Sequence, residues 1–251
     1  MARALSKFGV CSRTEAERWI GAGRVHVDGQ LVLVPARRID PRRSRVTVDG
    51  RAVSDQTERI VIALHKPKGY LTARLDPAGR ATVYDLLGEL DRWVFPVGRL
   101  DRDSSGLLLL TNDHRLGQRL TDPQQHVPKT YHVLVEGLPD RQALRALREG
   151  LPLDSQTATR PAQVRVLGSA RGGRSWLEVV LTEGKNRQVR RMCAAVGHQV
   201  LALTRVAIGR LPLGVLPLGR WRRLQPEELT LLGQAGKRGV VPSPPLSPRR
   251  P

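Results

Sequence analysis

The pattern of apolar and polar positions predicts a short helix close to the start of the chain. Residues 12–15, Ser-Arg-Thr-Glu, match a capping box, in which the serine caps the helix and the glutamate returns a hydrogen bond. Trp19 and Ile20 lie on the apolar face that follows. The helix is expected to end near Gly21 or Gly23, because glycine is a common helix stop.

Two similar segments follow this helix. Residues 24–32, Arg-Val-His-Val-Asp-Gly-Gln-Leu-Val, and residues 45–53, Arg-Val-Thr-Val-Asp-Gly-Arg-Ala-Val, each place alternating valines before Asp-Gly. This arrangement is a strong signal for a hairpin with a two-residue turn. An internal duplication and two independent strand–turn–strand units explain the similarity equally well. The polar residues 54–59 are interpreted as a linker.

Segments of strand length dominate the chain after the linker. Strands are expected at residues 60–64, 94–97, 107–110, 131–135, 164–167, 176–181 and 200–208, and helices at residues 83–87, 140–149 and 187–196. Lys66-Pro-Lys-Gly69 is expected to form a turn. Because strands and helices do not alternate regularly, a doubly wound parallel sheet is disfavoured. An α+β fold with a mixed, mostly antiparallel sheet is predicted instead.

The charge of the chain points to a polyanionic partner. Lysine and arginine total 42 against 23 aspartates and glutamates, so the net charge is +19 and the pI is near 11.4. A compositional preference for arginine is the alternative, and an aromatic content of 4% fits it as well. The distribution favours the polyanion, because residues 184–226 hold nine lysines or arginines and no acid. With apolar periodicity between the charges, this segment is typical of a folded basic surface.

Other features of the sequence exclude several classes of protein. Cys11 and Cys193 fit no metal-ligand spacing, and two reduced thiols in a cytoplasmic protein are favoured over one disulfide. No apolar run of about 18 residues occurs, so no membrane partner is expected. The first 13 residues are basic and acid-poor, as in a transit peptide. They lead directly into a capped helix, however, and are assigned to the fold.

Candidate chemistry concentrates in residues 98–106, Gly-Arg-Leu-Asp-Arg-Asp-Ser-Ser-Gly, between two apolar strands. Asp101 and Asp103 alternate there with Arg99 and Arg102. Catalytic carboxylates are often held on a loop between rigid strands. A charged turn with solvated ion pairs is the alternative. The pattern alone slightly favours that alternative, because aspartate and serine are ordinary turn residues.

Five motifs, in order along the chain, resemble those of the RsuA/RluB-type ribosomal pseudouridine synthases. They are Lys66-Pro-Lys-Gly69, Gly98-Arg-Leu-Asp101, Ser105-Gly-Leu-Leu-Leu-Leu-Thr-Asn-Asp113, Lys129-Thr-Tyr131 and Glu183-Gly-Lys-Asn-Arg-Gln-Val-Arg-Arg-Met192. Residues 3–50 are similar to the small α-L RNA-binding domain that precedes the catalytic domain in many members. The resemblance extends to about Leu229. It departs from the family pattern at His65, where an asparagine commonly stands.

The resemblance implies a division of the chain into three parts. Residues 1–55 are expected to form the RNA-binding domain and residues 56–234 the pseudouridine synthase domain. Residues 235–251 form a basic, proline-rich tail that is expected to be disordered. The implied partner is ribosomal RNA, and a monomer without cofactor or metal is expected.

The family's residue roles transfer by position. Asp101 aligns with the catalytic aspartate, Tyr131 with the tyrosine that stacks on the target base, and Arg190 with the basic residue that pairs with the aspartate. The substrate-binding candidates are Tyr131, Arg190, Arg99, Lys185 and Arg187. The reaction detaches uracil from its ribose, turns it over and rejoins it through carbon. A carboxylate can assist as nucleophile, base or counter-charge, and neighbouring arginine favours its ionised form.

Each role has a structural alternative. A tyrosine on an alternating strand, such as Tyr131, is most often a core residue, and arginines on a helix usually face solvent. Two other functions remain open, a non-catalytic RNA-binding factor of ribosome assembly and a synthase that acts on transfer RNA. The large ribosomal subunit is weakly favoured over the small one, from the motif at residues 183–192 and from residues 217–221.

Overall fold

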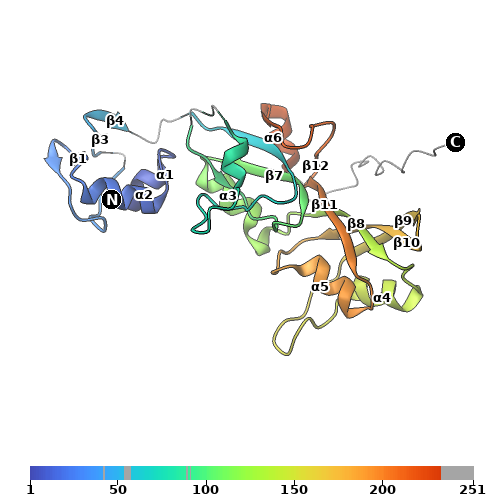
Figure 1. Cartoon of the computed structure of the whole chain (residues 1–251). Coiled ribbons are helices and arrows are strands. Elements are labelled where there is room, and N and C mark those ends of the chain that lie inside the picture. The colour runs from blue at the N-terminus through green and yellow to red at the C-terminus, as the bar shows by residue number, and fades with distance from the viewer. Residues whose placement is uncertain (42, 54–57, 89, 91, 233–251) are drawn as a thin grey trace.

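The computed structural model describes residues 1–41, 43–53, 58–88, 90 and 92–232, which build two separate sheets. A four-stranded sheet lies in the N-terminal unit, and a nine-stranded sheet lies in the larger unit. Figure 1 shows the N-terminal unit (blue) beside one end of the larger one. Most of the predicted linker, residues 54–57, and the predicted tail from residue 235 lie outside the described residues.

The N-terminal unit packs two helices against the small sheet. The helices are α1 (Ala2–Lys7) and α2 (Arg13–Gly21), and the strands are β1 (Val25–Val27), β2 (Gln30–Leu31), β3 (Val46–Val48) and β4 (Arg51–Val53). Ser12 Oγ accepts a hydrogen bond of 3.1 Å from the Glu15 backbone nitrogen, so the predicted cap is confirmed. Among the described residues, the Glu15 side chain does not accept the second capping-box hydrogen bond, from the Ser12 backbone nitrogen. Its carboxylate lies 3.6 Å from Arg74 of the larger unit instead.

Both predicted hairpins are confirmed. Asp28 and Gly29 have φ of 52° and 81°, and Asp49 and Gly50 have φ of 50° and 75°. These positive values are those of the tight turn that Asp-Gly favours. The alternating valines of β1 and β3 face the core, where they meet Leu5 and Ile20 from the helices. Helix α1 was not predicted, because six residues are too few to reveal a helical period.

The larger sheet is mixed and mostly antiparallel, as predicted. Its strand order is β13-β5-β7-β11-β8-β10-β9, with β6 and β12 paired at the side. Its strands are β5 (Val61–Lys66), β6 (Phe95–Pro96), β7 (Ser105–Thr111), β8 (Lys129–Glu136), β9 (Gln163–Ala170), β10 (Arg174–Leu181), β11 (Val200–Ile208), β12 (Leu211–Pro212) and β13 (Trp221–Arg223). Among the described strands, only β7 and β11 pair in parallel. This junction joins the two halves of the sheet.

The helices cover the sheet in two groups. Helices α4 (Arg141–Glu149) and α5 (Gln188–Ala195) pack on β8, β10 and β11 through Leu147, Val189 and Met192 and lie together in Figure 1. Helices α3 (His114–Thr121) and α6 (Pro226–Leu232) share a second core with β7 through Leu120 and Leu232. The short 3₁₀ helices are η1 (Val83–Leu86) and η2 (Pro123–Gln125).

Several predictions for this unit need correction. The strand expected at residues 94–97 has only two residues, because Pro96 has no N–H to continue a ladder. The helix expected at residues 83–87 is the 3₁₀ helix η1. Neither α3 nor α6 was predicted. Each has only seven or eight residues, so its apolar period is short.

Both cysteines lie in the part of the chain that the structure describes. Cys11 and Cys193 are free and buried, and burial raises the pKa of both thiols to about 12. Neither thiol is therefore a reactive thiolate at neutral pH. Within the described ranges, no helix is long and apolar enough to cross a membrane.

Candidate active site

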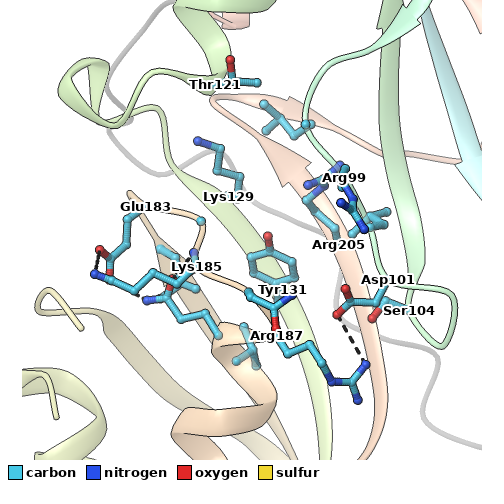
Figure 2. A pocket seen from close by; sticks show the side chains of 18 of the residues that line it. Arg99, Asp101, Ser104, Thr121, Lys129, Tyr131, Glu183, Lys185, Arg187 and Arg205 are labelled. Atoms are coloured by element: carbon cyan, nitrogen blue, oxygen red, sulfur yellow. Dashed lines mark hydrogen bonds and ion pairs between the residues drawn. The ribbon is translucent and has the colours of Figure 1, made fainter. Parts of the chain in front are cut away.

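A cavity of about 450 Å³ opens where the loop before β7 meets β8, β11 and the segment before α5. Five of the predicted site residues line it. They are Arg99, Asp101, Tyr131, Lys185 and Arg187 (Figure 2). Residues more than 80 positions apart in the sequence therefore share one site. Apolar side chains, among them Val97 and Leu203, complete the walls.

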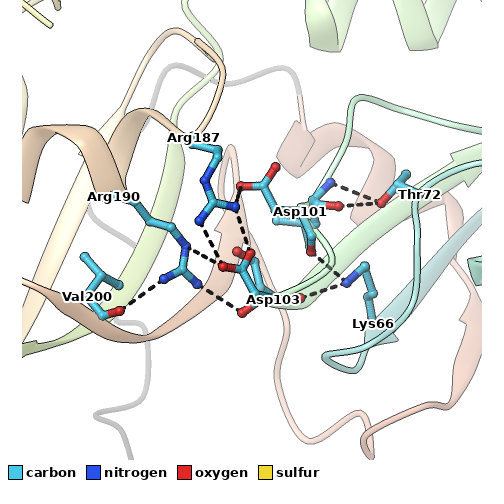
Figure 3. A network of polar contacts seen from close by, with 9 residues as sticks. Lys66, Thr72, Asp101, Asp103, Arg187, Arg190 and Val200 are labelled. Atoms are coloured by element: carbon cyan, nitrogen blue, oxygen red, sulfur yellow. Dashed lines mark hydrogen bonds and ion pairs between the residues drawn. The ribbon is translucent and has the colours of Figure 1, made fainter.

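A buried lysine holds the loop that carries Asp101. Lys66, at the end of β5, is completely buried. Its Nζ donates hydrogen bonds to the carbonyl oxygens of Pro67 (3.0 Å), Asp101 (2.9 Å) and Ser104 (2.8 Å). Figure 3 shows the lysine beneath the loop. All three donors of the ammonium group are used, and the loop is tied to the end of β5 at Asp101 and at Ser104.

Lys66 was not predicted as a site residue, because a lysine before Pro-Lys-Gly is typical of an exposed turn. Burial lowers its pKa to about 8, against the opposing effect of the nearby charges of Asp101 and Asp103. Thr72 adds a second tie, since its Oγ1 donates to the Leu100 carbonyl (2.7 Å) and accepts from the Leu100 nitrogen (3.2 Å). The side chains of Lys66 and Thr72 thus hold the main chain of the Asp101 loop in place.

Lys66→Met is expected to lower the single-turnover rate of the uridine isomerisation that the sequence resemblance implies, by at least about tenfold. The change leaves buried carbonyls without donors, at roughly 1–3 kcal/mol each, so the loop has to shift to regain partners. Lys68→Met is the matched control, because Lys68 is exposed two residues away. Rates and amide hydrogen exchange of residues 99–104 are measured for both variants. Equal rates in the two variants would contradict the positioning role.

The charges around Asp101 form a network with two arginines (Figure 3). Arg187 Nη1 lies 3.8 Å from the Asp101 carboxylate. The same guanidinium donates two hydrogen bonds to the Asp103 carboxylate, at 3.2 and 3.1 Å. Arg187 has the left-handed backbone φ of 47°, immediately before α5. Such a conformation is uncommon for arginine and is often found at functional sites.

The prediction that Arg190 pairs with Asp101 needs correction. Arg190 Nε lies 3.2 Å from the Asp103 carboxylate, and its Nη2 donates to the Asp103 carbonyl at 3.0 Å. Its Nη1 donates to the Val200 carbonyl at 3.1 Å. Arg190 is the third residue of α5, and its side chain reaches Asp103 and β11 rather than the cavity. The cation beside Asp101 is Arg187.

Asp103→Asn is expected to lower the melting temperature at neutral pH and to make no difference in acid. Burial disfavours the ionised carboxylate, but the Arg187 hydrogen bond and the Arg190 charge outweigh it, so the pKa of Asp103 lies below its ordinary value of 3.8. A carboxylate of this kind contributes stability above its unfolded pKa and loses it as the pH falls through the folded pKa. Melting of both proteins is compared from pH 7 downward. The difference should shrink below about pH 4, and a gap independent of pH would contradict the ion-pair account.

The remaining candidates lie at different depths. Tyr131 is half-buried on β8, where it packs against two cores and also lines the cavity. Arg99 is exposed at the rim. Lys185 lies 3.1 Å from Glu183, which is itself buried. The rim therefore carries the cations that solvent and a large ligand can reach.

Sequence reasoning did not single out several polar residues of the cavity wall, among them Ser104, Lys129 and Arg205. Arg205 was assigned to a core strand by its apolar neighbours, and Ser104 to the turn. Lys129 stands in the Lys-Thr-Tyr motif, which could have pointed to it. The described residues hold no group of three or more His, Cys, Asp or Glu side chains that could bind a metal ion.

The basic N-terminal unit and the cavity with a carboxylate, a tyrosine ring and a cationic rim define an enzyme that acts on RNA. Residues 60–195 match the family model described as RNA pseudouridylate synthase, and residues 3–43 match the S4 domain. The chain therefore belongs to the RNA pseudouridylate synthase family, and it is a pseudouridine synthase of the RsuA/RluB type. The predicted family, fold and enzyme class are confirmed.

Relatives of known name agree over nearly the whole length. Ribosomal large subunit pseudouridine synthase B of Bacillus subtilis is 36% identical, with 92% of this chain and 93% of the relative covered. The protein of the same name from Salmonella typhimurium is 40% identical, with 97% and 83% covered. A solved structure of a pseudouridylate synthase superposes with a TM-score of 0.66 at 26% identity and covers 92% of this chain and 98% of that one.

Proposed function

We propose that this enzyme converts a uridine of large-subunit ribosomal RNA to pseudouridine and that Asp101 is its catalytic residue. The observation that carries the proposal is the placement of the Asp101 carboxylate in the cavity wall with Tyr131, beside Arg187 at 3.8 Å. The names of the two relatives support ribosomal RNA of the large subunit as substrate. Chemical logic and relatedness thus favour the same reaction.

The cavity suits a nucleotide turned out of its stack. Its volume of about 450 Å³ lies in the range of small-ligand pockets. Tyr131 offers a ring face for stacking on the uracil base. The Asp101 carboxylate lies at one wall, where it can act on the sugar as nucleophile, as base or as counter-charge to a developing cation. Arg187 and Arg190 together offset the charges of Asp101 and Asp103.

The other cations are proposed to bind the RNA backbone. Arg99, Lys185 and Arg187 line the cavity rim and are suited to phosphate contacts. Arg190 contributes through Asp103, as a positioning residue of the loop. Residues 1–55 dock on folded RNA, residues 56–234 carry out the isomerisation, and the tail 235–251 adds weak affinity for RNA. The enzyme is proposed to act as a cytoplasmic monomer during ribosome biogenesis.

Incubation with separate RNA substrates tests this proposal. Purified enzyme is mixed with transcripts of large-subunit RNA, small-subunit RNA and unmodified transfer RNA, and pseudouridine is mapped in each. The expected result is modification of one uridine, or a few adjacent ones, in the large-subunit transcript. Modification of transfer RNA alone would support the second candidate substrate. RNA binding without modification in any pool would support a non-catalytic assembly factor.

A further inference from the structure

Two buried polar groups of the cavity wall lack hydrogen-bond partners within the described part of the chain. They are Nη2 of Arg205 and Oγ of Ser104. Arg205 is 4% exposed and Ser104 is 1% exposed, so bulk water does not reach them readily. Buried polar atoms are paired in most proteins, because an unpaired one is costly. A ligand that enters the cavity is one source of the missing partners.

Arg205 is fixed toward the cavity by the strands around it. It lies on β11 directly opposite Tyr131 of β8, and cross-strand partners share one face of a sheet. The β8–β11 register shifts between Arg205 and Ala207, and such bulges often re-aim a side chain beside an active site. Its Nε donates to the Leu107 carbonyl at 2.7 Å. This bond anchors the guanidinium and leaves the terminal nitrogens for other acceptors.

Arg205 shares the cavity wall with another cation and, in the described ranges, is not in an ion pair itself. No carboxylate among the described residues forms an ion pair with Arg205. Lys129 lines the same cavity, and burial, followed by the charge of Arg205, lowers its pKa to about 8. A buried arginine without an acid is expensive. Its position is understandable if a bound substrate supplies acceptors or negative charge.

A uracil ring fits this wall better than a phosphate does. Leu203 and Ile208 line the cavity near Arg205, and apolar neighbours suit the faces of a flat base. A phosphate is strongly hydrated and already has the exposed cations Arg99 and Arg187 at the rim. Uracil has two carbonyl oxygens, each an acceptor for a guanidinium or hydroxyl donor.

We propose that Arg205, with the Ser104 hydroxyl beside Asp101, donates hydrogen bonds to a carbonyl oxygen of the target uracil and stabilises that ring as an anion. This inference rests on the proposed function and deepens it. When the C1′–N1 bond breaks, its electron pair leaves with uracil and spreads over N1 and the carbonyl oxygens. C5 then returns an electron pair to C1′, the C5 proton is lost, and N1 takes up a proton. Atoms and electrons balance without a co-reactant.

In this scheme, a negatively charged residue faces the sugar fragment and a positively charged residue faces the base. The Asp101 carboxylate acts on the electron-poor sugar, and Arg205 acts on the electron-rich base. Donors that are already in place where charge develops stabilise a transition state more than the ground state. The loss of Arg205 should therefore reduce the rate of the chemical step more than it weakens the binding of RNA.

Sulfur substitution in the substrate tests the contact directly. Synthetic RNA fragments spanning the uridine that wild type modifies are made with uridine, 2-thiouridine or 4-thiouridine at that position. Single-turnover rates are measured at saturating enzyme for wild type, Arg205→Lys and Arg205→Gln. Because sulfur is a weak acceptor, one thio-substrate should slow wild type by about 10- to 100-fold. Arg205→Gln should convert uridine more slowly than wild type by a similar factor. Its rate on that thio-substrate should be only slightly lower than its rate on uridine.

The outcomes separate this inference from the function on which it rests. The contact would be overturned if sulfur substitution slowed wild type and Arg205→Gln by the same factor. A fully active Arg205→Gln would also overturn it. No pseudouridine from wild type on any RNA would overturn both proposals. Melting and RNA affinity are measured for each variant, and Arg205→Lys retains the charge in case glutamine disturbs folding. Arg174→Gln on β10, exposed at the strand start, is the matched control and should behave as wild type on all three substrates.

Discussion

Asp101→Asn is expected to lower the single-turnover rate of pseudouridine formation by more than about 1,000-fold. Asparagine keeps the size and polarity of the side chain but has no negative charge. It can therefore neither attack the sugar, nor remove a proton from it, nor balance positive charge on it. The assay follows isomerisation of uridine in the large-subunit transcript at saturating enzyme, so that weaker binding does not affect the measured rate.

The same variant should remain folded and bind RNA as well as wild type. The side chain of Asp101 is 29% exposed, and its contact with Arg187 is long at 3.8 Å. A partly exposed ion pair of this length contributes little to stability. The loop itself is held by the Asp101 carbonyl, which accepts from Lys66 and is unchanged by the substitution. RNA affinity should even rise slightly, because a negative charge near the phosphates is removed.

Asp103→Asn is the informative comparison, because Asp103 lies in the same loop but has closer ion-pair contacts than Asp101. Its carboxylate binds both Arg187 and Arg190, so its loss should reduce stability while much of the turnover remains. The two variants should therefore show opposite patterns in melting and in rate. Similar losses of both quantities in the two variants would mean that the loop is a charged structural turn. Substantial turnover by Asp101→Asn would remove Asp101 as the catalytic residue.

The sequence predicts the regular parts of this fold well, because local chemistry determines them. Asp-Gly after alternating valines fixes both hairpins, and apolar segments locate most strands of the larger sheet. The same reasoning cannot tell which strands are neighbours. The parallel junction of β7 and β11 joins segments almost 100 residues apart, and no local pattern records that pairing.

From the sequence, residues of the candidate site could be predicted only where they lie in a recognisable motif. Asp101 and Tyr131 were identified by position, Arg187 was named only as a substrate-binding candidate, and these three residues lie at one cavity. The choice between Arg187 and Arg190 could not be made from sequence, since the two arginines are three residues apart and their direction depends on the start of α5. In the sequence, Lys66 has the pattern of an exposed turn residue, and Arg205 stands as a single charged residue within an apolar strand. Their roles follow from burial, which is a property of the folded chain.

Gly106→Ala is expected to destabilise the larger unit by about 3–5 kcal/mol and to remove activity with it. Gly106 pairs with Arg205 across the parallel junction, and it has a φ of +111°. A β-carbon there would lie 2.2 Å from the Arg205 carbonyl oxygen and 2.5 Å from the Arg205 nitrogen. These are backbone atoms in the middle of a sheet, so neither strand can yield without breaking the pairing that positions both Asp101 and Arg205.

Gly219→Ala isolates the part of this effect that comes from the backbone conformation alone. Gly219 has a φ of +77°, and a β-carbon there would meet no other atom within 4 Å. This control should cost about 1–2 kcal/mol and leave the rate per folded molecule unchanged. Thermal melting is expected to fall by roughly 10 °C or more for Gly106→Ala and by only a few degrees for Gly219→Ala. Equal shifts would show that the close approach of β7 and β11 at Gly106 is not what requires glycine there.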